Sequence, residues 1–379
     1  MDNKQQLLQQ LFDKLKNSDY LKLQYIPTRK SFFGIFKEGE NILNLFTKKK
    51  HLMFYYSFAP SLYLKAIISG NKPLSFFYRF CFLNEEFTIE VIKQYLGKDW
   101  FSSSVEAGLL VSKNNLYRLA YSVLPINKYL ILRDSHYSYK YYEDDGGKPE
   151  NRVYVGADSV KFVQYNQKFL KGKKFKSTLE LGCGTGVQLI CVENLSEKLA
   201  GIDINPRAVE FTGISAKLNG LEDRFTVLES DLFENLDSKF DLILANPWFI
   251  DLEKGGLEEI PFIIEKLDNY LVPNGMFAIY FGSFIKDGID QGLTVLSKFA
   301  TENGYDAIFQ QLGRSVDPLL LDKFKELNIS HIQSYYAVLT KGGKGSIKVL
   351  PPNIARRFRD SIYLPLQRVL GKKSNKDLV

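Results

Sequence analysis

Cysteine and histidine are scarce in this chain of 379 residues, which has three of each. The cysteines, Cys81, Cys183 and Cys191, are odd in number and show no spacing typical of metal ligands. This argues against a disulfide framework and suits a reducing compartment. The histidines are scattered and indicate no metal site. We therefore expect a protein without a metal centre.

Long apolar runs are also missing. No stretch approaches the roughly 18 apolar residues of a membrane span. Residues 1–17 are polar and helix-forming, unlike the charged stub and apolar run of a signal peptide. Hydrophobic residues still make up 45% of the chain, enough for a large core, and its length exceeds the needs of one ordinary domain. We expect a soluble cytoplasmic protein of two domains that does not contact a membrane.

The net charge of +7 is unevenly distributed. Residues 1–150 carry 21 Lys and Arg against 15 Asp and Glu, residues 151–341 carry 20 against 26, and residues 342–379 carry 9 against 2. An acidic centre between basic flanks indicates either that the flanks meet a polyanion such as RNA or that surplus lysine keeps the protein dispersed.

The charged stretch EDDGGKPENR (143–152) lacks hydrophobic periodicity and is the best candidate for a linker. Beyond it, short apolar runs alternate with helix-like stretches, which indicates a parallel sheet covered on both faces. The predicted strands are 178–182, 199–203, 225–229, 240–245, 276–281, 305–309 and 334–340. One helix is well marked, with Asn205 as N-cap, Pro206 in the first turn and Gly220 as its stop.

The N-terminal region has a different pattern. Helical stretches at 61–70 and 87–97 precede two apolar runs, 108–111 and 116–119, which we expect to pair as a hairpin around a Lys113-Asn114-Asn115 turn. Helices followed by such a hairpin resemble a winged helix, although many small α+β domains share the pattern. Winged helices serve in dimerisation and substrate docking as well as in reading nucleic acids. The boundaries expected are an N-terminal α+β domain at 1–150, an α/β domain at 151–345 and a basic tail at 346–379.

A glycine-rich turn follows the first predicted strand of the α/β domain. LELGCGTGV (179–187) places Gly182, Gly184 and Gly186 between a buried strand and a helix, with Glu180 just before them. Glycines at such a turn let the backbone approach a ligand closely, and the helix N-terminus beyond favours polar or anionic groups. The G-x-G-x-G spacing differs from the G-x-G-x-x-G of dinucleotide binders.

Polar residues also end the next three strands. Asp203, in GIDINP, can accept hydrogen bonds from both hydroxyls of a ribose. Asp231 can accept from the exocyclic amine of an adenine on which Leu232 packs. The fourth strand, FDLILA, ends in NPWF, which begins with Asn246 and Pro247. Four such strand ends in sequence predict one ligand crevice at the carboxyl edge of an open α/β sheet.

With these motifs, residues 153–341 resemble the class I S-adenosylmethionine-dependent methyltransferases, a Rossmann-like, seven-stranded fold. Within that class they are similar to enzymes with an N-P-P-Y-like motif, such as the glutamine N5-methyltransferases of release factors and the small-domain guanine N2-methyltransferases of ribosomal RNA. The resemblance implies S-adenosylmethionine as cofactor, with VYVGADSVKFV (153–163) covering its methionine end. The residues implied are Glu180, Gly182, Gly184 and Gly186 for its amino-acid part, Asp203 for the ribose, Asp231 and Leu232 for the adenine, and Asn246, Pro247 and Phe249 for the acceptor nitrogen. Asn246 is also expected to contact the cofactor.

The chemistry of a planar amine explains why the residue types of the motif NPWF suit such an acceptor. The lone pair of such a nitrogen is delocalised, so it attacks a methyl donor poorly. The Asn246 side-chain oxygen and the Pro247 carbonyl can accept both amine hydrogens, which orients the nitrogen and stabilises the positive charge that forms on it. Phe249 can stack on the flat group. Trp248 replaces the second proline of the motif and alters the shape of the acceptor site. Cys183, inside the glycine turn, is interpreted as a small filler beside the cofactor.

Both an RNA base and a protein glutamine present this NH2 geometry, and the basic flanks favour RNA. A small-molecule methyltransferase and a cofactor-sensing regulator that binds DNA are the other readings; the amine-type motif argues against both. The oligomeric state stays open. In the tail, residues 351–373 put apolar side chains on one helix face and Arg356, Arg357 and Arg359 on others. That pattern fits a docked helix, a nucleic-acid contact or a helix on a membrane surface.

Overall fold

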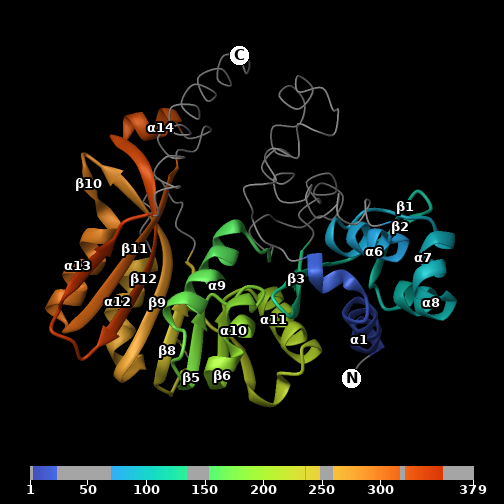
Figure 1. The fold of residues 1–379 in the computed structure, drawn as a ribbon, viewed down its shortest axis with the longest axis horizontal. Coiled ribbons are helices and arrows are strands. Elements are labelled where there is room, and N and C mark those ends of the chain that lie inside the picture. The colour runs from blue at the N-terminus through green and yellow to red at the C-terminus, as the bar shows by residue number, and fades with distance from the viewer. Residues whose placement is uncertain are drawn as a thin grey trace. The chain divides into compact units, whose positions relative to one another are not determined.

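The computed structural model describes residues 3–23, 70–134, 153–234, 236–247, 259–315 and 321–352 (Figure 1). Its contacts divide the chain into two units that interleave along the sequence. Unit 1 comprises residues 1–160, 184–191 and 205–227, and unit 2 comprises residues 161–183, 192–204 and 228–379. Within the described ranges, no helix combines the length and the apolar character needed to cross a bilayer.

A nine-stranded sheet forms the framework of the α/β region (Figure 1). Its strand order is β13 (Ile347–Leu350), β11 (Tyr305–Ser315), β12 (Ile329–Lys341), β9 (Leu271–Lys286), β8 (Phe240–Ala245), β5 (Phe175–Leu181), β6 (Ser196–Asp203) and β7 (Phe225–Glu229), while the short β10 (Ile289–Asp290) pairs with β9. β5, β6, β8 and β9 pair in parallel, whereas β12 runs antiparallel to β9 and β11. The predicted α/β fold class is confirmed, and each of the seven predicted strands is present.

Hydrophobic cores cover both faces of this sheet in unit 2. On one face, α12 (Glu259–Tyr270) and α13 (Gln291–Glu302) pack on side chains that include Ile243 and Phe277. On the other face, α9 (Ala157–Phe169) contributes Phe162 to a core with Leu244 and Tyr280. Successive residues of a strand point to opposite faces, so a strand buried on both faces must be apolar throughout. This explains the apolar run LILA (242–245) in β8, whereas Asp241 near the start of the strand is half-buried and accepts hydrogen bonds from Ser177. The short helices η5 (Glu193–Leu195) and α14 (Leu321–Glu326) complete the unit.

Strand β13 was not predicted, because the sequence places residues 347–350 in the basic tail. It pairs in parallel with β11, and a glycine-containing turn after β12 leads into it. Asp306, on β11, fastens that turn: one carboxylate oxygen accepts hydrogen bonds from the backbone N–H groups of Lys344 (2.9 Å) and Ser346 (3.0 Å) and from the Ser346 hydroxyl (2.5 Å). A local run of four residues with no periodicity gives no sequence signal for a strand held in this way.

The hydrogen bonds that Asp306 accepts from the turn before β13 predict that the stability of the protein depends on pH. The Ser346 hydroxyl first, and then the backbone N–H groups of Ser346 and Lys344, hold the pKa of Asp306 below its ordinary value. A carboxylate with a depressed folded pKa contributes stability above its unfolded pKa of about 3.9, and loses it as the pH falls through the lower folded value. At pH 7 we therefore expect Asp306→Asn to unfold at a lower temperature than the wild type. The two unfolding midpoints should converge below about pH 4, and a constant difference between them at all pH values would contradict this account.

Unit 1 contains the N-terminal helices and two hairpins. Its elements in this region are α1 (Asn3–Lys16), η1 (Asp19–Leu23), α6 (Lys72–Phe77), the π-helix η2 (Tyr78–Phe82), α7 (Ile89–Leu96), α8 (Lys98–Glu106), β1 (Leu110–Lys113), β2 (Leu116–Leu119), β3 (Ser122–Ile126) and β4 (Tyr129–Arg133). The predicted hairpin is confirmed: β1 and β2 pair antiparallel around Asn114 and Asn115, which both have positive φ angles, as a tight type I′ turn requires. Residues 61–69 of the predicted helix at 61–70 lie outside the described residues, and the winged-helix assignment stays a prediction.

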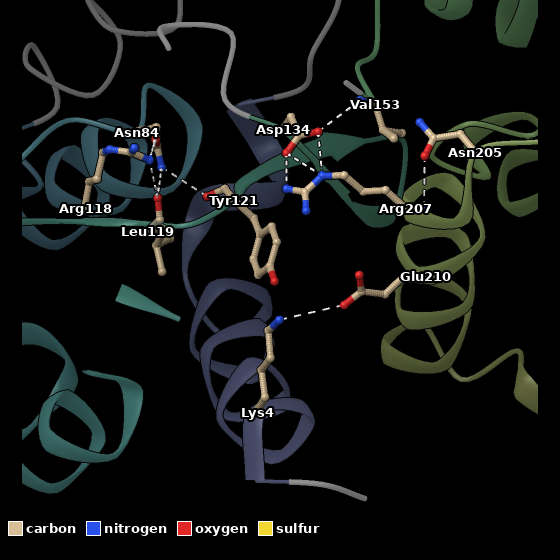
Figure 2. Close-up of polar contacts among 10 residues, drawn as sticks. All are labelled: Lys4, Asn84, Arg118, Leu119, Tyr121, Asp134, Val153, Asn205, Arg207 and Glu210. Atoms are coloured by element: carbon tan, nitrogen blue, oxygen red, sulfur yellow. Dashed lines mark hydrogen bonds and ion pairs between the residues drawn. The ribbon is translucent and has the colours of Figure 1, made fainter. Parts of the chain in front are cut away.

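The remainder of unit 1 comes from the α/β region: α10 (Val187–Cys191), α11 (Pro206–Leu218) and η6 (Glu222–Arg224). The predicted boundaries of α11 are confirmed, since the Asn205 side chain accepts from the Arg207 N–H at its start and Gly220 has a positive φ angle just after its end. Asn84, after η2, donates to the carbonyls of Leu119 (2.8 Å) and Tyr121 (3.1 Å), and so joins this segment to the chain between β2 and β3 (Figure 2).

Candidate functional site

The carboxyl ends of four strands bring predicted site residues together in unit 2. Leu181, the last residue of β5, pairs with Ile202 on β6 and with Ala245 on β8. The next residue on each strand path is Gly182, Asp203 and Asn246 respectively. Neighbouring strands lie about 4.8 Å apart, so the backbones of these three residues are neighbours along one edge of the sheet. That edge is where open α/β sheets bind ligands.

Backbone hydrogen bonds fix the segments that leave this edge. The Cys183 N–H donates to the Ile202 carbonyl at 2.9 Å, which keeps the turn after β5 against β6. The Ser230 N–H donates to the Asp203 carbonyl at 3.0 Å, which keeps the segment after β7 next to the tip of β6. Asp231 follows directly and is exposed, so its carboxylate is accessible beside that tip. Two of the predicted carboxylates thus come from adjacent strand ends.

The residues at this edge differ in exposure. Glu180 is buried, with 2% of its surface exposed, whereas Gly182 is exposed, has a positive φ angle and has no heavy atom within 4 Å of the position that a Cβ would take. Asp203 and Asn246 are half-buried. Backbone at Gly182 is therefore open to close approach by a ligand.

Two further predicted site residues are partly or fully buried. Leu232 has a positive φ angle and packs against the core beneath α12 and α13, with part of its side chain exposed. Pro247 is buried. Cys183 is 3% exposed, in keeping with its interpretation as a small filler. Trp248 and Phe249 lie outside the described residues, so the proposed stacking by Phe249 stays a prediction.

The second half of the glycine turn belongs to unit 1. Gly184 and Gly186 both have positive φ angles. The Thr212 hydroxyl, on α11, donates to the Gly184 carbonyl at 3.0 Å. A Cβ on Gly186 would lie 2.7 Å from the Cγ2 atom of Thr212, which is too close for two carbon atoms. Glycine is therefore required at 186 both by the backbone angle and by the packing of α11.

Thr212 is not among the predicted site residues. It lies inside a well-predicted helix, and it contacts a residue 28 positions earlier. No local pattern distinguishes it from the neighbouring positions of the helix, so only the packing of α11 on the turn reveals it.

Residues 166–307 match the family model described as the methyltransferase small domain. A Methanocaldococcus jannaschii protein, whose name assigns it protein N5-glutamine methyltransferase activity, is 37% identical over 34% of this chain and 55% of its own length. The ribosomal RNA small subunit methyltransferase C of Mannheimia succiniciproducens is 35% identical over 28% of this chain and 32% of its own length. The release factor glutamine methyltransferase of Agrobacterium fabrum is 31% identical over 32% of this chain and 48% of its own length. The chain thus spans only about a third to a half of these relatives.

The residues at the sheet edge fit the parts of S-adenosylmethionine. Gly182 offers open backbone for the amino-acid part, and Asp203 offers a half-buried carboxylate with two acceptor oxygens for a ribose. Asp231 and Leu232 offer an acceptor next to an apolar side chain, a combination suited to adenine. Residues 166–307 are therefore similar to the methyltransferase small domain, and the strand order and the groups at this sheet edge are compatible with that similarity.

Proposed function

We propose that the protein is an S-adenosylmethionine-dependent N-methyltransferase that acts on a planar amino group of a macromolecule, with an RNA base as the favoured acceptor. The observation that carries the proposal is the position of Asn246 and Pro247 at the end of β8, next to the tip of β5. The acceptor motif and Gly182 of the cofactor turn therefore meet at adjacent strand ends.

The chain's own groups have defined tasks in this proposal. The cofactor supplies an electrophilic methyl group. Asn246 and the carbonyl of Pro247 bind the two hydrogens of the acceptor amine and orient its nitrogen. They also stabilise the positive charge that develops on that nitrogen, and fixed acceptors are effective because they need no reorganisation during the reaction.

Two acceptor classes remain in view, each with its own support. The excess of Lys and Arg in residues 1–150 and 342–379 favours RNA. The names of two of the relatives, by contrast, refer to glutamine methylation. The basic tail from residue 353 onwards lies outside the described residues, so its contribution rests on charge alone.

Transfer of labelled methyl groups into a cell extract tests the proposal. We expect label in RNA, recovered on nucleosides after nuclease digestion, and weakening of RNA binding as salt rises. Each phosphate neutralised adds about 0.7 to 0.9 to the slope of log affinity against log salt. Label recovered on glutamine residues would replace RNA by a protein acceptor, and label confined to small molecules would contradict a macromolecular acceptor altogether. The Asn246→Ala variant is the control for background transfer.

A further inference from the structure

Asp134 connects three segments of unit 1 (Figure 2). It directly follows β4, and its backbone N–H donates to the Val153 carbonyl at 2.8 Å. Its carboxylate accepts the Val153 N–H at 3.0 Å and forms a bidentate ion pair with Arg207 on α11, in which the Nε–Oδ2 distance is 2.9 Å. Only 13% of the Asp134 side chain is exposed. Bidentate pairs between guanidinium and carboxylate fix orientation as well as distance, so this pair sets where α11 begins relative to β4.

Side chains at the C-terminal end of α11 also bind the backbone of β4. The Leu132 N–H donates to the Ser215 hydroxyl at 3.1 Å. Asn219 accepts from the Leu130 N–H at 3.2 Å and donates to the Leu130 carbonyl at 2.8 Å. Ser215 and Asn219 are four residues apart and are therefore neighbours on the surface at the C-terminal end of α11. Side chains of α11 thus satisfy backbone groups along the edge of β4.

Thr212 of α11 contacts the glycine turn. Thr212 donates to the Gly184 carbonyl and packs where a Cβ of Gly186 would lie. In α10, which follows the turn in sequence, the Gln188 side chain donates to the Ser159 carbonyl at 2.8 Å. Ser159 belongs to the segment that starts at Val153, which Asp134 also binds. Two series of contacts therefore start at Asp134. One runs through Arg207 and α11 to the turn, and the other runs through Val153 and Ser159 to Gln188, which follows the turn.

We infer that Asp134 and Arg207 are positioning residues for the cofactor turn at 184–186: their ion pair holds α11 against β4, so that Thr212 keeps the turn in its binding conformation. This rests on the proposed function, because it takes that turn as part of the cofactor site. Neither residue is among those that the family resemblance assigns to the cofactor. The N-terminal region accordingly contributes to cofactor affinity through α11, without contact with the cofactor.

The affinity for S-adenosylhomocysteine, measured by calorimetry on the full chain, tests the inference. Asp134→Asn keeps an acceptor for the Val153 N–H but loses the charge pair, and Arg207→Gln removes the guanidinium. We expect each to weaken binding by about tenfold, the size of coupling carried through packed elements, and the double variant to be no weaker than either single one. At saturating cofactor, kcat should stay near the wild-type value while KM for the cofactor rises.

Lys4→Gln is the matched control. The Nζ atom of Lys4, on α1, lies 3.7 Å from the Oε1 atom of Glu210, which belongs to α11 like Arg207 (Figure 2). This ion pair is partly exposed and does not involve Asp134. Its removal should leave affinity unchanged. A variant Thr212→Val, which lacks the hydroxyl donor to Gly184, keeps the test decisive if the charge variants fold poorly, and it too should weaken binding several-fold.

Three results would overturn the inference. The first is that folded Asp134→Asn and Thr212→Val bind S-adenosylhomocysteine as tightly as the wild type and differ only in a lower unfolding midpoint. The ion pair of Asp134 and Arg207 would then stabilise the fold without affecting cofactor affinity. Equal weakening by Lys4→Gln would show a general effect of destabilising α11. Failure of the wild type itself to bind S-adenosylhomocysteine would reject the proposed cofactor, and the inference with it.

Discussion

Replacement of Asn246 by alanine is expected to lower methyl transfer to the true acceptor by about 100-fold or more, with affinity for S-adenosylhomocysteine close to that of the wild type. The variant loses the side-chain acceptor for one amine hydrogen. Most of the residues proposed to hold the cofactor lie on β5, β6 and the segment after β7, and they are unchanged. Binding and chemistry should therefore separate in this variant: kcat falls, whereas the affinity for the cofactor product does not.

Asn246→Asp provides the matched comparison. Aspartate keeps an oxygen acceptor at the same position, so this variant should retain more activity than Asn246→Ala. Single-turnover measurements with saturating cofactor would distinguish the two. Normal turnover by Asn246→Ala would show that the amine is held by other groups, and the acceptor role of NPWF would have to be abandoned.

Replacement of Asp203 by alanine should have its effect on the cofactor instead. A ribose that loses the acceptor for its hydroxyls leaves polar groups without a partner, which costs about 1 to 3 kcal/mol, or about 5- to 150-fold in the dissociation constant. Calorimetry with S-adenosylhomocysteine measures this directly. Asp237→Ala, which removes an exposed carboxylate between β7 and β8, is the control and should bind normally.

A different ligand would produce a different result. Should the wild type bind NADH but not S-adenosylhomocysteine, the G-x-G-x-G turn and Asp203 would belong to a dinucleotide site, and the proposed cofactor would be wrong. Unchanged affinity in Asp203→Ala would leave the cofactor in place but remove the ribose contact from this strand end.

Local sequence patterns predicted the strands, the N-cap of α11 and the hairpin of β1 and β2 because each depends on neighbouring residues. Runs of apolar residues mark buried parallel strands, and Asn at an N-cap satisfies a helix N–H two residues later. The strand-end residues Gly182, Asp203 and Asn246 could be placed together for the same reason, since parallel strands present their carboxyl ends at one edge of a sheet.

Features that depend on distant contacts could not be predicted. Asp134 and Arg207 are separated by 73 positions, and nothing near either residue indicates its partner. The expected boundary near residue 150 treats the chain as consecutive pieces, whereas the contacts group α10 and α11 with the N-terminal region. Strand β13 also could not be predicted from the sequence, because its pairing depends on Asp306, which binds a turn about 40 residues later.

Strand β13 determines where this protein can be shortened. A truncation after Lys341, the natural choice for removing the basic tail, would also remove the partner of β11 and expose the backbone N–H and C=O groups of residues 307–310. Open strand edges of this kind recruit other chains and lead to aggregation. Loss of RNA binding in such a protein would then reflect self-association rather than loss of positive charge. A cut after Pro352 preserves the sheet and still removes seven of the nine basic residues between 342 and 379.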